Sequence, residues 1–212
     1  MLLEVKRIIV PPGQTVVLEN ISWSEFEAIL EDLGESRGSR IAYDTGKLEI
    51  MTPLPEHEVN KEFISDFVKV LLEELDIEFC PLGSTTFKNQ AMFKGIEPDS
   101  CFYIRNEAAV RGKYRLDLAV DPPPDLALEI DITNRSHPDI YKSLGVPELW
   151  QYSQGKLKFL LLVNGKYIKS KTSSIFPNFP ILEVIPQYLS QCRTEGRNKG
   201  MKAFRSWVRE QV

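Results

Sequence analysis

The sequence has few of the residues that build disulfide or zinc frameworks. Its 212 residues include three cysteines and two histidines, with no CxxC pair and no cysteine–histidine cluster. Widely spaced cysteines in odd number exclude a disulfide scaffold, and the set lacks the ligand spacing of a structural zinc site. We expect Cys80, Cys101 and Cys192 to be reduced thiols in a cytoplasmic protein, the first two of them buried.

Long apolar runs and a net positive charge are also missing. No stretch approaches the roughly 18 apolar residues that span a bilayer, and the N-terminus lacks the pattern of a secretory signal peptide. We therefore expect a soluble, cytoplasmic protein with no membrane partner. The net charge of −4 argues against a surface that coats nucleic acid non-specifically, but it is compatible with a local basic groove.

Internal repeats and low-complexity linkers are absent too. With 42% hydrophobic residues, the chain can build one substantial core, so we expect a single domain over residues 1–212. Its expected parts are an N-terminal arm, helix and hairpin at 1–53, a core at 54–169 and C-terminal helices at 170–212.

Local signals predict the N-terminal elements. Residues 1–20 are typical of an arm or an edge strand. Ser22 and Glu25 have the spacing of a capping box, which predicts a helix over about 23–33. Asp44-Thr45-Gly46 then predicts a tight hairpin between strands near 40–43 and 47–51.

The rest of the chain predicts a mixed sheet with helices. Apolar residues recur at helical spacing from Pro55 to about Leu75. The order of elements predicts an α/β (α+β-like) fold, with a mixed central sheet flanked by helices and an N-terminal helix and β-hairpin extension. Further strands are expected at 77–80, 85–88, 99–104, 125–133, 149–152, 156–163 and 166–169, and further helices near 138–144, 181–192 and 197–210.

Two acidic strand ends are the place where the sequence suggests chemistry. Glu97-Pro98-Asp99 leads into one strand, and Glu129 and Asp131 lie on another, on the face opposite Leu128 and Ile130. A buried carboxylate is costly unless it is paired, so these acids either bond a Lys or Arg or bind a cation. If the two strands are neighbours, three carboxylates converge, and Mg²⁺ prefers such oxygen ligands. Taken alone, the Pro-Asp pair is more typical of a turn aspartate at the entrance of a strand.

The arrangement of these acids resembles the signature of the PD-(D/E)XK nuclease superfamily. A longer series of motifs over residues 22–163 resembles, more specifically, a bacterial family of that superfamily described as putative restriction endonucleases. The motifs that carry the resemblance are, in order, Gly46-Lys47-Leu48-Glu49-Ile50-Met51-Thr52-Pro53, Pro55-Glu56-His57-Glu58, Gly83-Ser84-Thr85-Thr86, Glu97-Pro98-Asp99, Leu128-Glu129-Ile130-Asp131-Ile132-Thr133 and Leu144-Gly145-Val146-Pro147-Glu148-Leu149-Trp150.

This resemblance implies a restriction-endonuclease-like fold and a Mg²⁺-dependent (or Mn²⁺-dependent) endonuclease that hydrolyses phosphodiester bonds in DNA. Asp99 and Glu129 would bind the metal, with the carbonyl oxygen of Ile130 as a further ligand. An acid of the first core helix, Glu58 or Glu56, would assist. Members of the superfamily often dimerise to cut both strands, so a homodimer is expected.

One position departs from the superfamily pattern. Asp131 stands where the motif usually has a lysine that orients or activates the attacking water. Asp131 could instead add a metal ligand or act as a base toward water. Lys88 is the first candidate for the missing cation, and Lys142 and His137 are weaker ones. If none of them substitutes, the protein is a catalytically inactive nuclease fold used for DNA binding or protein association.

Other residues allow two interpretations. His57 either binds metal or phosphate or is an ordinary helix-terminal histidine. Trp150 and Tyr152 share a strand face and either stack on bases or, as their apolar neighbours favour, pack in the core. The basic residues of the C-terminal segment are either a solvated helix face, which we favour, or a phosphate-binding flank: Arg193, Arg197, Lys199, Lys202, Arg205 and Arg209.

Overall fold

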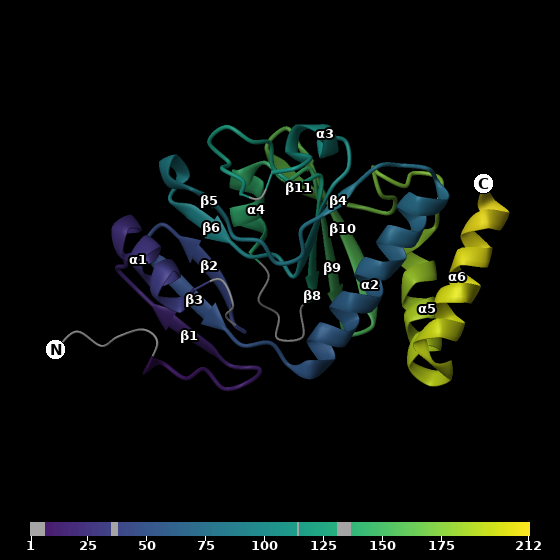
Figure 1. Ribbon diagram of the computed structural model, residues 1–212, viewed down its shortest axis with the longest axis horizontal. Coiled ribbons are helices and arrows are strands. Elements are labelled where there is room, and N and C mark those ends of the chain that lie inside the picture. The colour runs from purple at the N-terminus through teal and green to yellow at the C-terminus, as the bar shows by residue number, and fades with distance from the viewer. Residues whose placement is uncertain (1–6, 35–37, 114, 131–136) are drawn as a thin grey trace.

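The computed structural model describes residues 7–34, 38–113, 115–130 and 137–212. The described strands form a five-stranded and a six-stranded sheet. Figure 1 shows the N-terminal sheet at one side of the molecule, helices α2, α5 and α6 at the other, and the larger sheet between them. No helix in this part of the chain is long and apolar enough to cross a membrane.

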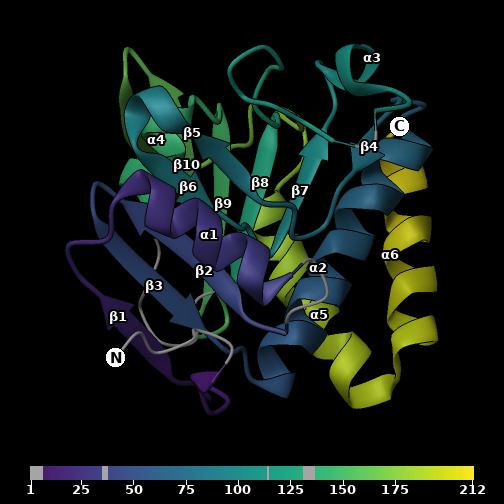
Figure 2. The same cartoon turned by 60° about the vertical axis from the view of Figure 1, so that its left-hand side comes forward.

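The N-terminal sheet is antiparallel and carries helix α1 (Trp23–Leu33) on one face (Figure 2). The predicted capping box is present: the backbone N–H of Ser22 donates to Glu25 at 2.8 Å, and the Ser22 hydroxyl accepts from the Glu25 amide. The Phe26 ring packs so closely on β6 that a Cβ at Gly95 would lie 2.8 Å from it. In sheet order, the strands are β1 (Thr15–Leu18), β3 (Lys47–Met51), β2 (Arg40–Asp44), β6 (Lys94–Ile96) and β5 (Phe87–Asn89).

The larger sheet is mixed, because β8 and β9 run parallel and its other neighbours are antiparallel. Helices α2 (Pro55–Glu74), α5 (Ile181–Glu195) and α6 (Arg197–Gln211) share a hydrophobic core with one face. Helix α4 (Pro138–Leu144) packs on the other, and α3 (Glu107–Val110) and η2 (Gln90–Met92) are short. In sheet order, the strands are β11 (Lys166–Ser170), β10 (Lys156–Val163), β9 (Glu148–Ser153), β8 (Leu126–Ile130), β7 (Ser100–Tyr103) and β4 (Cys80–Pro81).

Strand β8 has the two faces that its alternation predicts. Leu126, Leu128 and Ile130 belong to the core that α2, α5 and α6 complete. Ala127 belongs to the core on the α4 side, and the Glu129 carboxylate is bonded from α4 on that same side. The mixed α/β architecture predicted from the order of elements is therefore present, and it puts an acidic side chain at the end of a central strand.

The second sheet is the feature that local patterns did not predict. Strand β6 was missed because it has three residues, one of them glycine, and follows Phe93 in the left-handed conformation. It pairs with β2 through Ala42 and Ile96, and β5 pairs with β6 in turn. As a result, β5 belongs to the N-terminal sheet, and this moves Lys88 out of the sheet that holds β7 and β8.

Candidate metal centre

The two acidic strand ends meet because β7 and β8 are antiparallel neighbours. Ser100 lies opposite Leu128 in the ladder, and continuing that register by one residue places Asp99 opposite Glu129. The Asp99 carboxylate also accepts a hydrogen bond from the backbone N–H of Ile130 at 2.7 Å. The carboxylates of two strand ends, 30 positions apart in the sequence, therefore lie on one face of the mixed sheet.

A cavity between the two sheets contains this pair. Its volume is about 690 Å³ when the solvent-open mouth is included, but the centres of water molecules can occupy only about 60 Å³ of it. A water needs roughly 10–15 Å³ on the latter measure, so the interior has room for about four to six waters or a hydrated ion. A duplex could reach only the mouth. The acidic and basic residues among the described lining are Arg40, Glu49, His57, Glu97, Asp99, Glu129 and His137.

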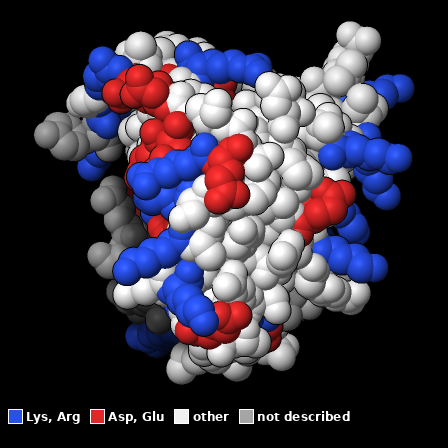
Figure 3. Space-filling model, turned by 90° about the vertical axis from the view of Figure 1, so that its right-hand side faces the viewer, with Lys and Arg blue, Asp and Glu red and all other residues white. Residues whose placement is uncertain are grey.

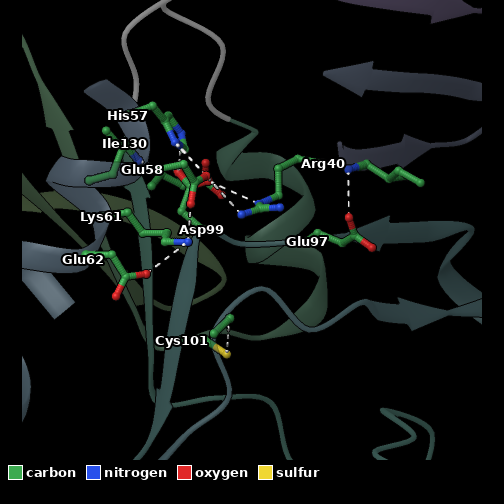
Figure 4. Close-up of polar contacts among 12 residues, drawn as sticks. Arg40, His57, Glu58, Lys61, Glu62, Glu97, Asp99, Cys101 and Ile130 are labelled. Carbon is green, nitrogen blue, oxygen red and sulfur yellow. Dashed lines mark hydrogen bonds and ion pairs between the residues drawn. The ribbon is translucent and has the colours of Figure 1, made fainter. Parts of the chain in front are cut away.

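Asp99 is 2% exposed and has two basic neighbours (Figure 4). His57 of α2 places Nε2 3.0 Å from one carboxylate oxygen, and Arg40 of β2 places Nε 3.8 Å from the other. Neither contact has hydrogen-bond geometry, and both ring nitrogens of His57 and Nε of Arg40 are buried without a hydrogen-bond partner in the described chain. Asp99 is thus surrounded by donors that are close but not fully engaged.

Glu58 extends this cluster along α2. Its carboxylate accepts a hydrogen bond from Arg40 at 3.2 Å and another from Lys61. Burial raises the pKa of Glu58, but the Lys61 hydrogen bond and the charges of Lys61, Arg40 and His57 outweigh it and hold the pKa below its ordinary value of 4.5. Glu58 is therefore ionised at neutral pH. Because a carboxylate with a lowered pKa is a weak base, Glu58 suits an electrostatic role better than a role in proton transfer.

Glu129 is held by a tyrosine from the short helix. The hydroxyl of Tyr141, on α4, donates to the Glu129 carboxylate. Burial, the Glu129 charge and this hydrogen bond raise the pKa of Tyr141 well above its ordinary value, so the hydroxyl keeps its proton and stays a donor. The bond fixes the orientation of one carboxylate oxygen of Glu129.

At the other side of the cavity, His137 faces the N-terminal sheet. Its Nε2 lies 3.2 Å from the carboxylate of Glu49 on β3. Glu49 also pairs with Lys47 at 2.6 Å. A second, more open depression lined by Asp44, Lys47, Glu49 and His137 continues from the cavity toward the β2–β3 turn.

The structure does not bring every predicted residue to the carboxylates. Lys88 bonds Glu27 of α1 at 2.7 Å, Glu56 faces Arg193 at 3.3 Å, and Lys142 bonds Asp139. None of these three is among the described residues that line the cavity. Asp131 lies outside the described residues, so its predicted role stays a prediction.

The C-terminal arginines and the strand aromatics also have structural partners. Arg193, Arg197, Arg205 and Arg209 bond acids of α2, so basic side chains alternate with acidic ones on the helical face in Figure 3. Trp150 is fully buried against Phe159 and Phe176. These contacts favour the packing interpretations over a phosphate flank or a base-stacking site.

Sequence reasoning missed Arg40, Tyr141 and Glu49. The sequence places Arg40 only at the start of a strand, Tyr141 only in the short helix expected near 138–144, and Glu49 only within a family motif. Arginine is seldom buried in a protein. Its position at the start of an apolar strand is the signal that could have drawn attention to Arg40.

The donor set suits a hard divalent cation. Asp99 and Glu129 share a cavity wall, and Mg²⁺ commonly binds to one or two carboxylates while it keeps several waters or contacts substrate phosphates. A ready-made cluster of three or more His, Cys, Asp or Glu ligands is not found among the described residues. These residues therefore fit a partly hydrated cation held by few protein ligands, not one enclosed by protein.

Comparison with known proteins addresses the family. No curated protein matches the sequence significantly. The crystal structure of a putative nuclease belonging to DUF820 from Anabaena variabilis is similar at 14% identity and a TM-score of 0.48, covering 71% of this chain and 85% of that one. A family model described as Uma2, "Putative restriction endonuclease", matches residues 23–190. The match spans most of the sequence, and the chain belongs to this restriction-endonuclease-like family.

Proposed function

We propose that this protein is a Mg²⁺-dependent endodeoxyribonuclease that hydrolyses phosphodiester bonds in DNA. The observation that carries the proposal is the meeting of Asp99 and Glu129 in a cavity that admits a hydrated ion. Membership of a nuclease family supports the reaction class, and the oxygen-rich donor set supports Mg²⁺ or Mn²⁺ over softer metals.

Asp99, Glu129 and the carbonyl oxygen of Ile130 would hold the metal. When bound, such a cation lowers the pKa of a water molecule and stabilises the charge that builds on the phosphate. The chain's own contribution is preorganisation. The Ile130 amide fixes one oxygen of Asp99 and Tyr141 fixes one oxygen of Glu129, and both acids line the cavity.

Glu58 would act one step away from the metal. Glu58 is not among the described residues that line the cavity, but its carboxylate accepts a hydrogen bond from Arg40, and Arg40 does line the cavity. Its lowered pKa keeps it negatively charged, and this charge holds Arg40 and His57 next to Asp99. Asp131 would complete the site as an additional ligand or as a base toward water.

The experiment is cleavage of supercoiled plasmid with Mg²⁺ or Mn²⁺, comparing wild type with Asp99→Asn. Loss of a metal-binding carboxylate is expected to lower the cleavage rate at least about a hundredfold. Asp139→Asn is the matched control, because Asp139 is 77% exposed on α4 and pairs only with Lys142 among its described neighbours. Asp99→Asn protein that cleaves like the control would refute the assignment.

The same protein variants also test the alternative function. If wild type binds duplex DNA but neither cleaves it nor binds Mn²⁺ in calorimetry, the chain is an inactive nuclease fold used for DNA binding or protein association. We also propose a homodimer, which would place two cavities on one duplex. Light scattering at several protein concentrations measures this state independently of activity.

A further inference from the structure

Acidic side chains outnumber lysine and arginine among the described residues that line the cavity of Asp99. Four of these residues are acidic, namely Glu49, Glu97, Asp99 and Glu129. A phosphodiester is an anion, so this lining repels the substrate that the proposed function requires. A divalent cation offsets part of this charge, but phosphate binding also calls for positive groups supplied by the protein.

Arg40 is the single lysine or arginine among the described residues that line the cavity. Its side chain is 14% exposed and lies between the carboxylates of Glu58 and Asp99 (Figure 4). In the described chain it donates one hydrogen bond, from a terminal nitrogen to Glu58 at 3.2 Å. Its Nε is buried and has no hydrogen-bond partner among the residues that the structure describes.

This pattern differs from that of an arginine with a purely structural role. Arg205 on α6 bonds both Glu73 and Glu74 through separate nitrogens, at 2.8 and 2.5 Å. Arg40 stands 3.8 Å from Asp99, beyond hydrogen-bond distance, and most of its five donors are not used in the described contacts. A buried donor without a partner is costly, so its persistence beside a cavity points to a ligand that satisfies it.

We propose that Arg40, which lines this cavity, binds the scissile phosphate. The inference rests on the proposed function and adds a substrate-binding group to it. A guanidinium matches two oxygens of a phosphate with parallel hydrogen bonds, which a lysine ammonium cannot do. Arg40 would thus supply a positive group of the protein at this site, whereas Lys88, the sequence-based candidate for the cation that orients the attacking water, is not among the described residues that line the cavity.

The test uses Arg40→Gln and Arg40→Lys in the full chain. Affinity for a fluorescein-labelled duplex of about 20 base pairs is measured by anisotropy in Ca²⁺, under conditions where no cleavage is detected in parallel. We expect Arg40→Gln to weaken duplex binding about tenfold and Arg40→Lys to recover part of the loss. In calorimetry, Mn²⁺ should bind Arg40→Gln at least as tightly as wild type, because a positive charge beside Asp99 has been removed.

The control is Lys69→Gln, which removes one positive charge from α2 where Lys69 pairs with Asp66 at 3.1 Å. Duplex affinity of Arg40→Gln equal to that of this control overturns the inference, and so does a wild type that does not bind the duplex. The proposed function is judged separately by Asp99→Asn cleavage, so an active wild type with an unaffected Arg40→Gln refutes only the inference. If Arg40→Gln does not fold, Arg40→Lys decides: weaker duplex binding supports the inference, and unchanged binding overturns it.

Discussion

Buried acids lie beside both ends of strand β8, but the hydrogen bonding around them differs. Beside the beginning of β8, Glu148 of the parallel neighbour β9 accepts from Trp150 Nε1 at 2.6 Å and from the amide and hydroxyl of Ser174 at 2.8 and 2.6 Å. Asp125 at the same end accepts from the amides of Ile104 and Asn106. At the other end, Asp99 has the Ile130 amide as a hydrogen-bond donor, and its two basic neighbours are not aligned with it.

The contrast separates structural carboxylates from a carboxylate available for chemistry. Glu148 is fully buried, yet neutral donors occupy both of its oxygens, so its charge is stabilised without a counter-ion. Asp99 is almost as buried but faces a cavity with unsatisfied donors around it. Incomplete satisfaction costs stability and leaves lone pairs available for a cation, as expected where function and stability compete.

The largest expected difference comes from matched amide substitutions at the two ends. Glu148→Gln places an NH₂ group against a donor and should lower the free energy of unfolding by about 2–3 kcal/mol, a fall in Tm of about 6 °C. Asp99→Asn should change the free energy of unfolding by less than about 1 kcal/mol, because its donors are poorly engaged. Urea unfolding monitored by tryptophan fluorescence measures both. Equal destabilisation would remove the contrast between the two ends.

Tyr141→Phe removes a single hydroxyl group, the one that donates to Glu129 in the cavity. Without the donor to Glu129, cleavage should fall about tenfold and the free energy of unfolding by about 1 kcal/mol. Tyr103→Phe is the matched control, because Tyr103 is equally buried and its hydroxyl donates to the carbonyl of Pro122 at 2.9 Å. The control should lose similar stability and no activity. Equal activity in the two variants would mean that Tyr141 is structural.

The smallest effect is expected at Lys88, whose side chain is 42% exposed and pairs with Glu27 across the N-terminal sheet. Lys88→Gln should alter the free energy of unfolding by less than about 0.5 kcal/mol and leave cleavage unchanged, because exposed ion pairs contribute little. Plasmid cleavage and thermal unfolding measure both quantities. A loss of cleavage without loss of stability would return Lys88 to the position of the catalytic cation.

The sequence by itself determined the elements whose signals are local. The Ser22–Glu25 capping box, the periodic apolar face of α2 and the alternation of β8 each depend on residues a few positions apart. The sequence also singled out Asp99 and Glu129 as candidate site residues, because acids at the ends of apolar strands are costly without a partner, and the family resemblance predicted that they bind a metal.

Only the tertiary structure decided which cation accompanies those acids. The pairing of β6 with β2 and with β5 placed Lys88 in the N-terminal sheet, and the packing of β2 near α2 and the start of β7 brought Arg40 close to Asp99. Tyr141 likewise reaches Glu129 through the packing of α4 on the sheet. Such contacts join residues far apart along the chain, and they follow from strand pairing and core packing, which no local period in the sequence encodes.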